Sequence, residues 1–164
     1  MRAGTALAVL LLLAGTPARA AHTRVLYGYP YAPHCPAAGV ADVVDRWGMY
    51  ECNCTSYVAW ALQANGQRID WFIRGAMNAW NWPHVAQLSG IAVGTTPAAG
   101  AVAVWPHQSP PFGHLAYVSA VERNGTIDVG EYNENVFQPY LFDVRRGVSV
   151  RGATFIYVPR RDRE

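Results

Sequence analysis

An asparagine-glycine pair separates two apolar stretches in the C-terminal half of the chain. Residues 114–122 and 126–132 are rich in valine, isoleucine, leucine and tyrosine, and Asn124-Gly125 lies between them. This dipeptide is preferred in tight two-residue turns, because asparagine and glycine adopt positive φ angles more easily than other residues. The sequence therefore predicts a β-hairpin, and it restricts the chain to folds that contain an antiparallel sheet.

The predicted hairpin register brings three polar residues to one face of the sheet. Cross-strand partners project from the same face, and this register places Asn133 diagonal to His114, with Glu131 one residue pair further along. A carboxylate or an amide in such a position can hold an imidazole in the orientation needed for proton transfer. The alternative is that His114 is an ordinary loop histidine and that the two other residues line a solvated face.

A helix is predicted before the hairpin. Apolar residues recur at helical spacing over residues 54–62, so that they form one apolar face. Asn53 is a suitable N-cap, and Asn65-Gly66 supplies a suitable C-terminal stop. Cys54 is therefore expected in the first turn of this helix.

The remaining elements complete the predicted fold class. A second, shorter helix is expected around residues 75–80 and is ended by Pro83, because the residue before a proline disfavours the helical conformation. Short apolar runs at residues 101–105 and 155–158 predict two further strands. One helical region followed by a mostly antiparallel sheet indicates an α+β fold.

The first twenty residues have the three parts of a secretory signal peptide. A positively charged start is followed by an apolar run at residues 6–14, and Ala18-Arg19-Ala20 matches a cleavage site of the A-x-A type. The apolar run is too short to cross a bilayer core of about 30 Å, which argues against a membrane anchor. We therefore expect residues 1–20 to be removed and the mature protein to be secreted or retained in the periplasm or cell wall.

Beyond the cleavage site, the sequence predicts one domain with short flanking segments. Residues 21–46 form an expected N-terminal arm, residues 47–158 the main domain, and residues 159–164 a charged tail. The full sequence has 13 Lys+Arg and 11 Asp+Glu, and removal of Arg2 and Arg19 makes these counts equal. A neutral domain has no electrostatic footprint for nucleic acid or anionic lipid, so neither is expected as a partner.

An odd number of cysteines constrains the exported protein further. Three cysteines in an oxidising compartment can form one disulfide and leave one thiol. Cys52 and Cys54 lie too close in sequence to bond without strain, so Cys35 is the natural partner of one of them. Cys52 can bond to the arm without distorting a helix, whereas the N-terminus of a helix favours the thiolate of Cys54. We therefore predict a Cys35–Cys52 disulfide and a free, reactive Cys54.

Four segments, in the order in which they occur, resemble the CHAP family, the cysteine, histidine-dependent amidohydrolases/peptidases of bacterial cell-wall turnover. They are WGMYECNCTSYVAWAL, PAAGAVAVW, FGHLAYVSAV and GTIDVGEYN, and the resemblance extends over residues 47–158. It implies a papain-like α+β fold, with N-terminal helices packed on an antiparallel β-sheet. It also implies that Cys54 is the nucleophile and His114 the base, and that Glu131 and Asn133 are orienting groups.

The chain departs from the family pattern at two positions. Asn53 stands where members often have a glutamine just before the nucleophile, and Ala101 stands where they often have an aspartate. Any contribution of that glutamine to the oxyanion hole would pass to Asn53 in this chain.

Together the residues and the resemblance predict a secreted peptidoglycan hydrolase that uses Cys-His nucleophilic catalysis. The bond that it cleaves is either the muramoyl-L-alanine amide or a peptide bond of the stem or cross-bridge. We expect peptidoglycan as the partner, no cofactor and a monomeric protein. The rival interpretation is a catalytically inactive wall-binding or scaffold domain, but the nucleophile, base and orienting positions all carry competent side chains.

A zinc site is the alternative use of the cysteines. His34, Cys35, Cys52 and Cys54 include two ligand types that zinc prefers. Their spacing is not that of a usual zinc site, so no metal is predicted.

Three tryptophans are candidates for substrate contact. Trp80, Trp82 and Trp105 could stack on sugar rings or on a peptide stem, although core packing is the default interpretation of each one. We expect one of the three to contact substrate.

Overall fold

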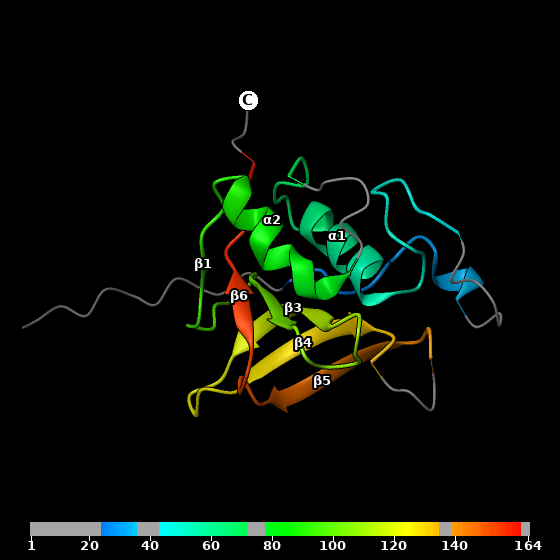
Figure 1. Ribbon diagram of the computed structural model, residues 1–164. Coiled ribbons are helices and arrows are strands. Elements are labelled where there is room, and N and C mark those ends of the chain that lie inside the picture. The colour runs from blue at the N-terminus through cyan, green and yellow to red at the C-terminus, as the bar shows by residue number, and fades with distance from the viewer. Residues whose placement is uncertain (1–23, 36–42, 72–77, 135–138, 162–164) are drawn as a thin grey trace, which may run out of the picture.

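The computed structural model describes residues 24–35, 43–71, 78–134 and 139–161 of the chain (Figure 1). The predicted signal peptide and residues 75–77 of the second predicted helix lie outside these ranges. Within these ranges, no helix is both long enough and apolar enough to cross a membrane.

The described residues form helices that precede a six-stranded sheet. The helices are α1, Cys54–Ala64, and α2, Trp82–Leu88, and single 3₁₀ turns are formed by Ala32–His34 and Ala79–Asn81. The strands are β1 (Val93–Gly94), β2 (Val102–Trp105), β3 (His114–Val121), β4 (Ile127–Tyr132), β5 (Phe142–Val148) and β6 (Thr154–Ile156). The predicted α+β fold class is confirmed.

The sheet is antiparallel and strongly twisted. Its strand order is β1-β6-β2-β3-β4-β5, and each neighbouring pair is antiparallel. Figure 1 shows the two helices over one face, with α1 above β3 and β4. In the same view β6 stands nearly upright whereas β5 runs across the picture, which reflects the accumulated twist of neighbouring strands.

The strands contribute side chains to two apolar cores. Successive residues of a strand point to opposite faces, so Leu115 and Tyr117 of β3 pack with α1, whereas Ala116 and Val118 pack on the other face with Phe155. Burial of each large apolar side chain stabilises the fold by about 1.5–3 kcal/mol. With both faces covered, β3 is held rigidly, and its first residue, His114, lies at a fixed position.

The predicted hairpin between β3 and β4 is present, but its turn has three residues instead of two. Glu122 N donates to Thr126 O at 2.8 Å, and Gly125 has a φ of 84° whereas Asn124 does not have a positive φ. This is the geometry of a type I turn followed by a left-handed glycine. The extra loop residue moves β4 by one position relative to the predicted register.

A bulge in β3 moves the register by one further position. The pairing shifts between Val118 and Ala120, so that Ser119 is the additional residue, and Val118 lies opposite Val129. A regular two-residue hairpin would have placed Val118 opposite Glu131. The predicted register is therefore wrong by two residues, but an even shift leaves each side chain on its predicted face.

The prediction for α1 is confirmed, whereas that for the second helix is wrong. Asn65 is the C-cap of α1, and Gly66 follows it with a φ of 73°. The second helix begins at Trp82, with Pro83 in its first turn, instead of ending there. Proline is favourable at this position because the first N–H groups of a helix have no intrahelical acceptor and because its fixed φ is helical.

Two edge strands, β1 and β5, have no clear sequence signal. β1 contains two residues, and β5 has the sequence FDVRRGV, in which charges and a glycine interrupt the alternation of an ordinary strand. β5 is only partly buried because it covers one edge of the sheet. Its pairing with β4 nevertheless brings a charged residue into the candidate site, as described below.

The described ends of the arm and the tail contact the domain. Tyr29 of the arm is buried in the core beside α1. At the other end, Arg161 N donates to Gly66 O at 2.9 Å and Arg68 N donates to Pro159 O at 3.0 Å. The chain after β6 therefore lies along the segment that follows α1.

Candidate active site

Cys54 is the first residue of α1. Asn53 before it has extended backbone angles, with φ −102° and ψ 164°, and residues 55–62 after it are buried. Cys54 itself is partly exposed and is the free cysteine of the described residues. Its thiol is therefore held at the rim of a rigid helix, near the N–H groups of the first turn, which favour negative charge.

His114 lies between this thiol and a carboxylate. The residue is 1% exposed, its Nε2 bonds Glu131 Oε2 at 2.8 Å, and the interaction with the Cys54 side chain is among the causes that raise its pKa. Since Nε2 is used by Glu131, Nδ1 is the nitrogen that faces the thiol. One imidazole can thus exchange a proton with Cys54 while the carboxylate fixes its orientation.

A glycine permits the chain to enter β3 at His114. Gly113 has a φ of 73°, and a Cβ atom at this position would lie 2.8 Å from Trp80 N. Any other residue would therefore be strained in its backbone and would clash with the backbone before α2. This close approach also places Trp80 next to the candidate site.

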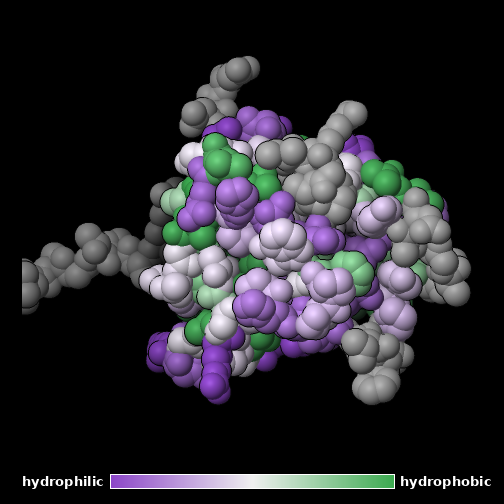
Figure 2. Space-filling view, viewed as in Figure 1, coloured by the Kyte–Doolittle hydropathy of each residue, from purple (hydrophilic) through white to green (hydrophobic). Residues whose placement is uncertain are grey.

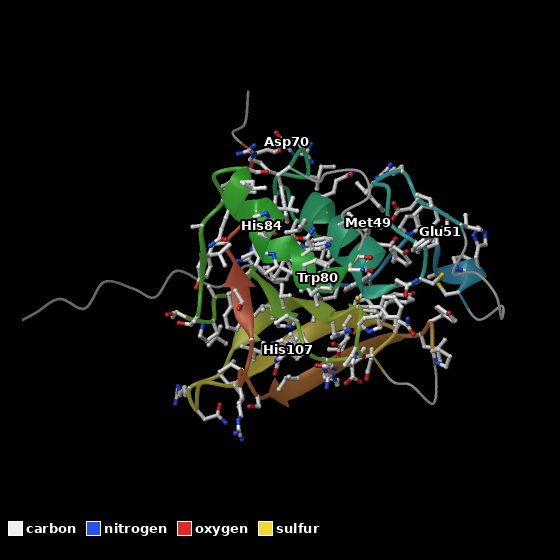
Figure 3. All side chains as sticks on the ribbon, viewed as in Figure 1. Met49, Glu51, Asp70, Trp80, His84 and His107 are labelled. Carbon is white, nitrogen blue, oxygen red and sulfur yellow. A yellow bond between two sulfur atoms is a disulfide. The ribbon has the colours of Figure 1, made fainter. Side chains whose placement is uncertain are left out.

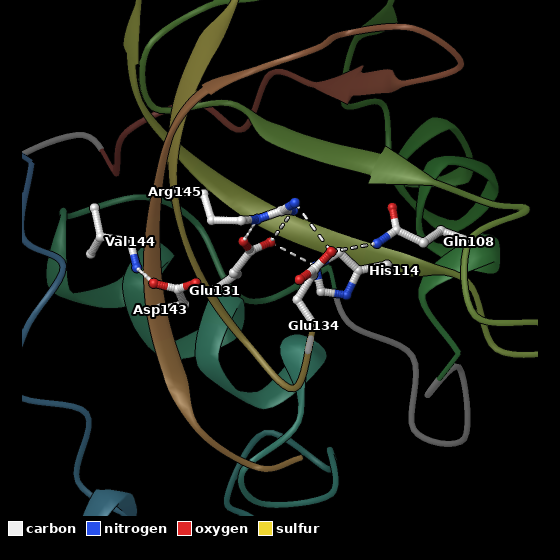
Figure 4. A network of polar contacts seen from close by, with 7 residues as sticks. All are labelled: Gln108, His114, Glu131, Glu134, Asp143, Val144 and Arg145. Carbon is white, nitrogen blue, oxygen red and sulfur yellow. Dashed lines mark hydrogen bonds and ion pairs between the residues drawn. The ribbon is translucent and has the colours of Figure 1, made fainter. Parts of the chain in front are cut away.

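Glu131 is fully buried and is held by Arg145 as well as by His114 (Figure 4). Arg145 Nε donates to Oε1 of Glu131, and Arg145 Nη2 donates to Oε2 at 3.1 Å. Arg145 Nη1 also pairs with Glu134 Oε1 at 3.1 Å, and Gln108 Nε2 donates to the same Glu134 atom at 3.2 Å. The carboxylate that orients the histidine is therefore part of a fixed network of charges.

These contacts determine the charge of the pair. Burial alone would lower the pKa of His114, but hydrogen bonds and charges from Cys54 and Glu131 raise it to about 9. Burial alone would raise the pKa of Glu131, but His114 and Arg145 hold it below its ordinary value. At neutral pH the imidazole is therefore protonated and the carboxylate ionised.

Asn133 forms no hydrogen bond with His114 in the described part of the chain; it bonds Asn53, the residue before Cys54. Its Nδ2 donates to Asn53 Oδ1 at 2.8 Å, and its Oδ1 accepts a bond from Tyr140 N at 3.1 Å. The predicted register favours Asn133 over Glu131 as the neighbour of His114. The two-residue shift brings Glu131 to the diagonal position predicted for Asn133, and Asn133 follows the last residue of β4 with a φ of 57°, so it no longer has the strand conformation. Asn133 instead fixes the side chain of Asn53, which makes no capping bond to α1.

The loop before Cys54 is held at several points. The predicted Cys35–Cys52 disulfide is present, and Cys52 N donates to Tyr29 Oη at 3.0 Å. The same hydroxyl bonds Ser56, which in turn donates to the buried Asp45. Burial raises the pKa of Tyr29 far above its ordinary value, so the hydroxyl stays neutral and can both donate and accept.

The three candidate tryptophans differ in exposure. Trp82 is 2% exposed and packs edge-on against Trp71, which leaves no ring face for a substrate. Trp105 is 8% exposed and stacks on the His114 ring, with the ring centroids 6.3 Å apart. Trp80 is 48% exposed and lies between the helices and the sheet at the front of the view in Figure 3. Trp80 and Trp105 are therefore the candidates that remain for substrate contact.

Arg145 is a site residue that the sequence pattern did not reveal. It lies opposite Val129 in the pairing of β4 and β5, so it shares the face of the sheet from which Glu131 projects. The sequence carries only a weak signal for this strand, in that Phe142, Val144 and Val148 are apolar residues separated by even numbers of positions. That pattern permits a third strand beside the hairpin, with the arginine on its polar face.

Metal ligands do not gather in the part of the chain that the structure describes. No group of three or more histidine, cysteine, aspartate or glutamate side chains in this part could hold a metal ion. Two of the four residues considered for zinc, Cys35 and Cys52, form the disulfide instead.

Comparison with known families gives one match that covers most of the candidate site. The model of the CHAP domain matches residues 44–133, which is more than half of the chain. Cys54, His114, Glu131 and Asn133 all lie in this range, whereas Arg145 lies beyond it.

Comparison with curated proteins gives relatives from Staphylococcus aureus. A probable autolysin, LDP, is 34% identical over 92 residues, which are 56% of this chain and 32% of that protein. The staphylococcal secretory antigen ssaA2 is 41% identical over 56 residues, which are 34% of this chain and 20% of the antigen. The matched segments thus span about a third or less of each relative's length.

A solved structure shares the fold. The N-acetylmuramoyl-L-alanine amidase from Staphylococcus aureus superposes with a TM-score of 0.56 at 22% sequence identity, over 67% of this chain and 31% of that one. At this level of identity the likeness supports the papain-like α+β fold and nothing further.

Proposed function

Because the chain belongs to the CHAP family, we propose that it is a peptidoglycan hydrolase that cleaves an amide bond with Cys54 as nucleophile. The observation that carries the proposal is a single buried imidazole, that of His114, which bonds the Glu131 carboxylate and whose pKa is raised by its interactions with Cys54 and Glu131. Relatives named as an autolysin and a secretory antigen support an exported, wall-directed role.

The first step is the attack of sulfur on the amide carbonyl. The raised pKa of His114 favours the thiolate–imidazolium pair, in which the thiol proton of Cys54 is already held at His114 Nδ1 before the attack. Cys54 Sγ then forms a bond to the carbonyl carbon, and the carbonyl electrons move to oxygen. Glu131 stabilises the positive charge of the imidazolium throughout.

Collapse of this intermediate breaks the C–N bond. His114 returns its proton to the departing nitrogen, which leaves as an amine, and the acyl group remains on Cys54 as a thioester. Water then adds to the thioester carbonyl, and His114 accepts a proton from it. Release of the carboxylic acid breaks the C–S bond and restores the Cys54 thiolate beside the protonated His114.

The negative oxygen that forms in each addition step needs hydrogen-bond donors. The backbone N–H of Cys54 at the start of α1 is one suitable donor. Asn53 is the second, because its Nδ2 carries two hydrogens and, among the described residues, donates only to Glu51 O at 3.1 Å. Asn133 supports this role by holding Asn53 Oδ1.

The bond that is cleaved is either the muramoyl-L-alanine amide or a peptide bond of the stem or cross-bridge. The two reactions leave different products, since an amidase frees the amino group of the first stem residue and an endopeptidase leaves part of the stem on the sugar. Mass spectrometry of digested, purified peptidoglycan distinguishes them by the new termini.

The proposal is tested by digestion of purified peptidoglycan with the wild-type protein and with Cys54→Ala. We expect the wild-type protein to release soluble fragments and Cys54→Ala to release none while its circular dichroism spectrum stays native. Cys54→Ser provides a matched control of nearly the same shape with a much poorer nucleophile. Fragment release by Cys54→Ala at the wild-type rate would contradict a cysteine-dependent mechanism.

A further inference from the structure

A groove of about 660 Å³ opens beside the His114–Glu131 pair. Two of its walls belong to the candidate active site, because Trp105 stacks on the His114 ring and Arg145 bonds Glu131. Its lining also includes Arg146 and Arg151, and we call the whole groove the arginine groove. Its volume suits a ligand as large as several linked residues.

The lining of the arginine groove is positively charged. Three arginines line it against one carboxylate, Glu134, and that carboxylate is already paired with Arg145. Arg145 is in turn bonded to Glu131. Within the described ranges, no carboxylate forms an ion pair with Arg146 or Arg151, and both side chains are exposed. Two guanidinium groups thus face the groove without a protein counter-charge.

A bulge in β5 explains how two successive arginines reach the same groove. Neighbouring residues in a regular strand point to opposite faces, but the pairing of β4 with β5 shifts between Ile127 and Val129. Gly147 at this bulge has a φ of 63°, and its N–H donates to Asp128 Oδ1 at 2.9 Å. The backbone is therefore fixed in a form that turns Arg146 toward the side on which Arg145 lies.

The geometry points to a subsite in the arginine groove that binds a carboxylate of the substrate's peptide stem, through Arg146 and Arg151. The planar guanidinium group presents paired N–H donors that match the two oxygens of a carboxylate. Figure 2 shows that strongly hydrophilic residues also gather along the lower rim of the molecule, over the β3–β4 turn and the end of β5. The assignment rests on the proposed function, because peptidoglycan stems supply such carboxylates.

The stacked Trp105 links the subsite to the reaction centre. One edge of the groove is formed by the same indole ring that stacks on His114, so this ring connects the groove with the imidazole, which does not itself line the groove. A stem whose carboxylate is bound by Arg146 and Arg151 would therefore be positioned relative to Cys54. This makes the groove a determinant of substrate choice and affinity, not of the chemical step.

Binding to the inactive Cys54→Ala chain tests the subsite without consuming the ligand. The probes are fluorescein-labelled muropeptides whose stem carboxylates are either free or converted to amides. We expect the free form to bind about tenfold more tightly, with a difference that shrinks as salt is added, because exposed charges are screened. Fluorescence anisotropy measures both affinities.

Matched substitutions assign the preference to the two arginines. Arg146→Gln combined with Arg151→Gln is expected to abolish the difference between the probes, and the corresponding lysine variants are expected to keep part of it. Arg123→Gln, in the β3–β4 turn, is the control and should leave both affinities unchanged. In the active chain, the double glutamine variant is expected to raise KM with little change in kcat.

Each outcome separates the subsite from the proposed function. Equal binding of the two probes, or an unchanged preference in the double glutamine variant, overturns the carboxylate subsite. If the active chain then still digests peptidoglycan, the proposed function stands without it. A carboxylate preference that depends on both arginines, in a chain that hydrolyses no amide bond, would support the subsite and contradict the proposed function.

Discussion

Arg145 donates hydrogen bonds to both carboxylate oxygens of Glu131, and one of these oxygens also bonds His114. The three residues come from the neighbouring strands β5, β4 and β3. A fully buried carboxylate is stable in its charged form only when such partners surround it. The ion pair with Arg145 therefore sets both the charge and the orientation of the group that faces the imidazole.

The pH dependence of the reaction should follow the protonation of His114. The folded-state pKa of His114 is about 9, above the ordinary value of about 6.5. The stabilisation that imidazolium gives to the fold is therefore complete below pH 6.5 and is lost as the pH rises through 9. We predict that kcat/KM falls on the alkaline side with a midpoint near pH 9, measured with a soluble muropeptide.

Glu131→Gln should displace this alkaline limb toward lower pH, because the interaction with Cys54 remains but the carboxylate charge that also raises the pKa of His114 is removed. We also expect kcat to fall by about 100-fold or more, since an amide stabilises imidazolium poorly. Asn133→Ala, which removes the contact to Asn53, should lower kcat by roughly tenfold and leave the limb near pH 9. A limb that moves in Asn133→Ala but not in Glu131→Gln would show that Asn133 is the residue that orients His114.

Loss of Arg145 should damage both stability and activity. Arg145→Met leaves Glu131 buried without its charged partner, and we predict a decrease in the free energy of unfolding of about 3–5 kcal/mol in urea titrations. The pKa of Glu131 should rise, which lowers kcat at neutral pH.

The double variant Arg145→Met with Glu131→Gln separates the two effects. It removes the unpaired charge, so it should recover much of the stability and none of the activity. Arg123→Met, at an exposed turn position, is the control for loss of an arginine. Equal stability of Arg145→Met and the wild-type protein would mean that water reaches Glu131 and that the ion pair is not needed.

The faces of the hairpin could be predicted from the sequence, but its register could not. Alternation assigns His114 and Glu131 to one face in the predicted register, and in any register that differs from it by an even number of residues. The shift itself arises from a left-handed Gly125 and from a bulge at Ser119. Both depend on packing against neighbouring strands, and Asn-Gly is compatible with either turn type. The choice between Glu131 and Asn133 therefore required the structure.

The other site residues show the same contrast between features that nearby residues predict and features that depend on strand pairing. The start of α1 at Cys54 follows from a cap residue and an apolar period within eleven residues. Arg145, in contrast, reaches Glu131 through the pairing of β5 with β4, and the bulged, charged sequence of β5 does not resemble a strand. Pro83 marked a helix boundary, but the sequence did not show on which side the helix lay.

A thiol reagent should inactivate the protein, whereas a chelator should not. The thiolate of Cys54 is itself the nucleophile, so iodoacetamide is predicted to abolish hydrolysis with the modification of one thiol per chain. EDTA is predicted to leave the rate unchanged, because the proposed steps need no Lewis acid. Inactivation by EDTA that zinc reverses would contradict the cysteine mechanism and support a metal-dependent one.

The disulfide should stabilise the loop that presents Cys54. Cys35 and Cys52 are separated by 17 positions, and closure of a loop of this length in the unfolded chain typically contributes about 3 kcal/mol. We predict that Cys35→Ala combined with Cys52→Ala lowers the free energy of unfolding by about this amount. Mild reduction should destabilise the wild-type protein and leave the double variant unaffected.

Non-reducing peptide mapping should find Cys35 linked to Cys52 and Cys54 open to alkylation. A Cys35–Cys54 link would instead exchange the roles of Cys52 and Cys54.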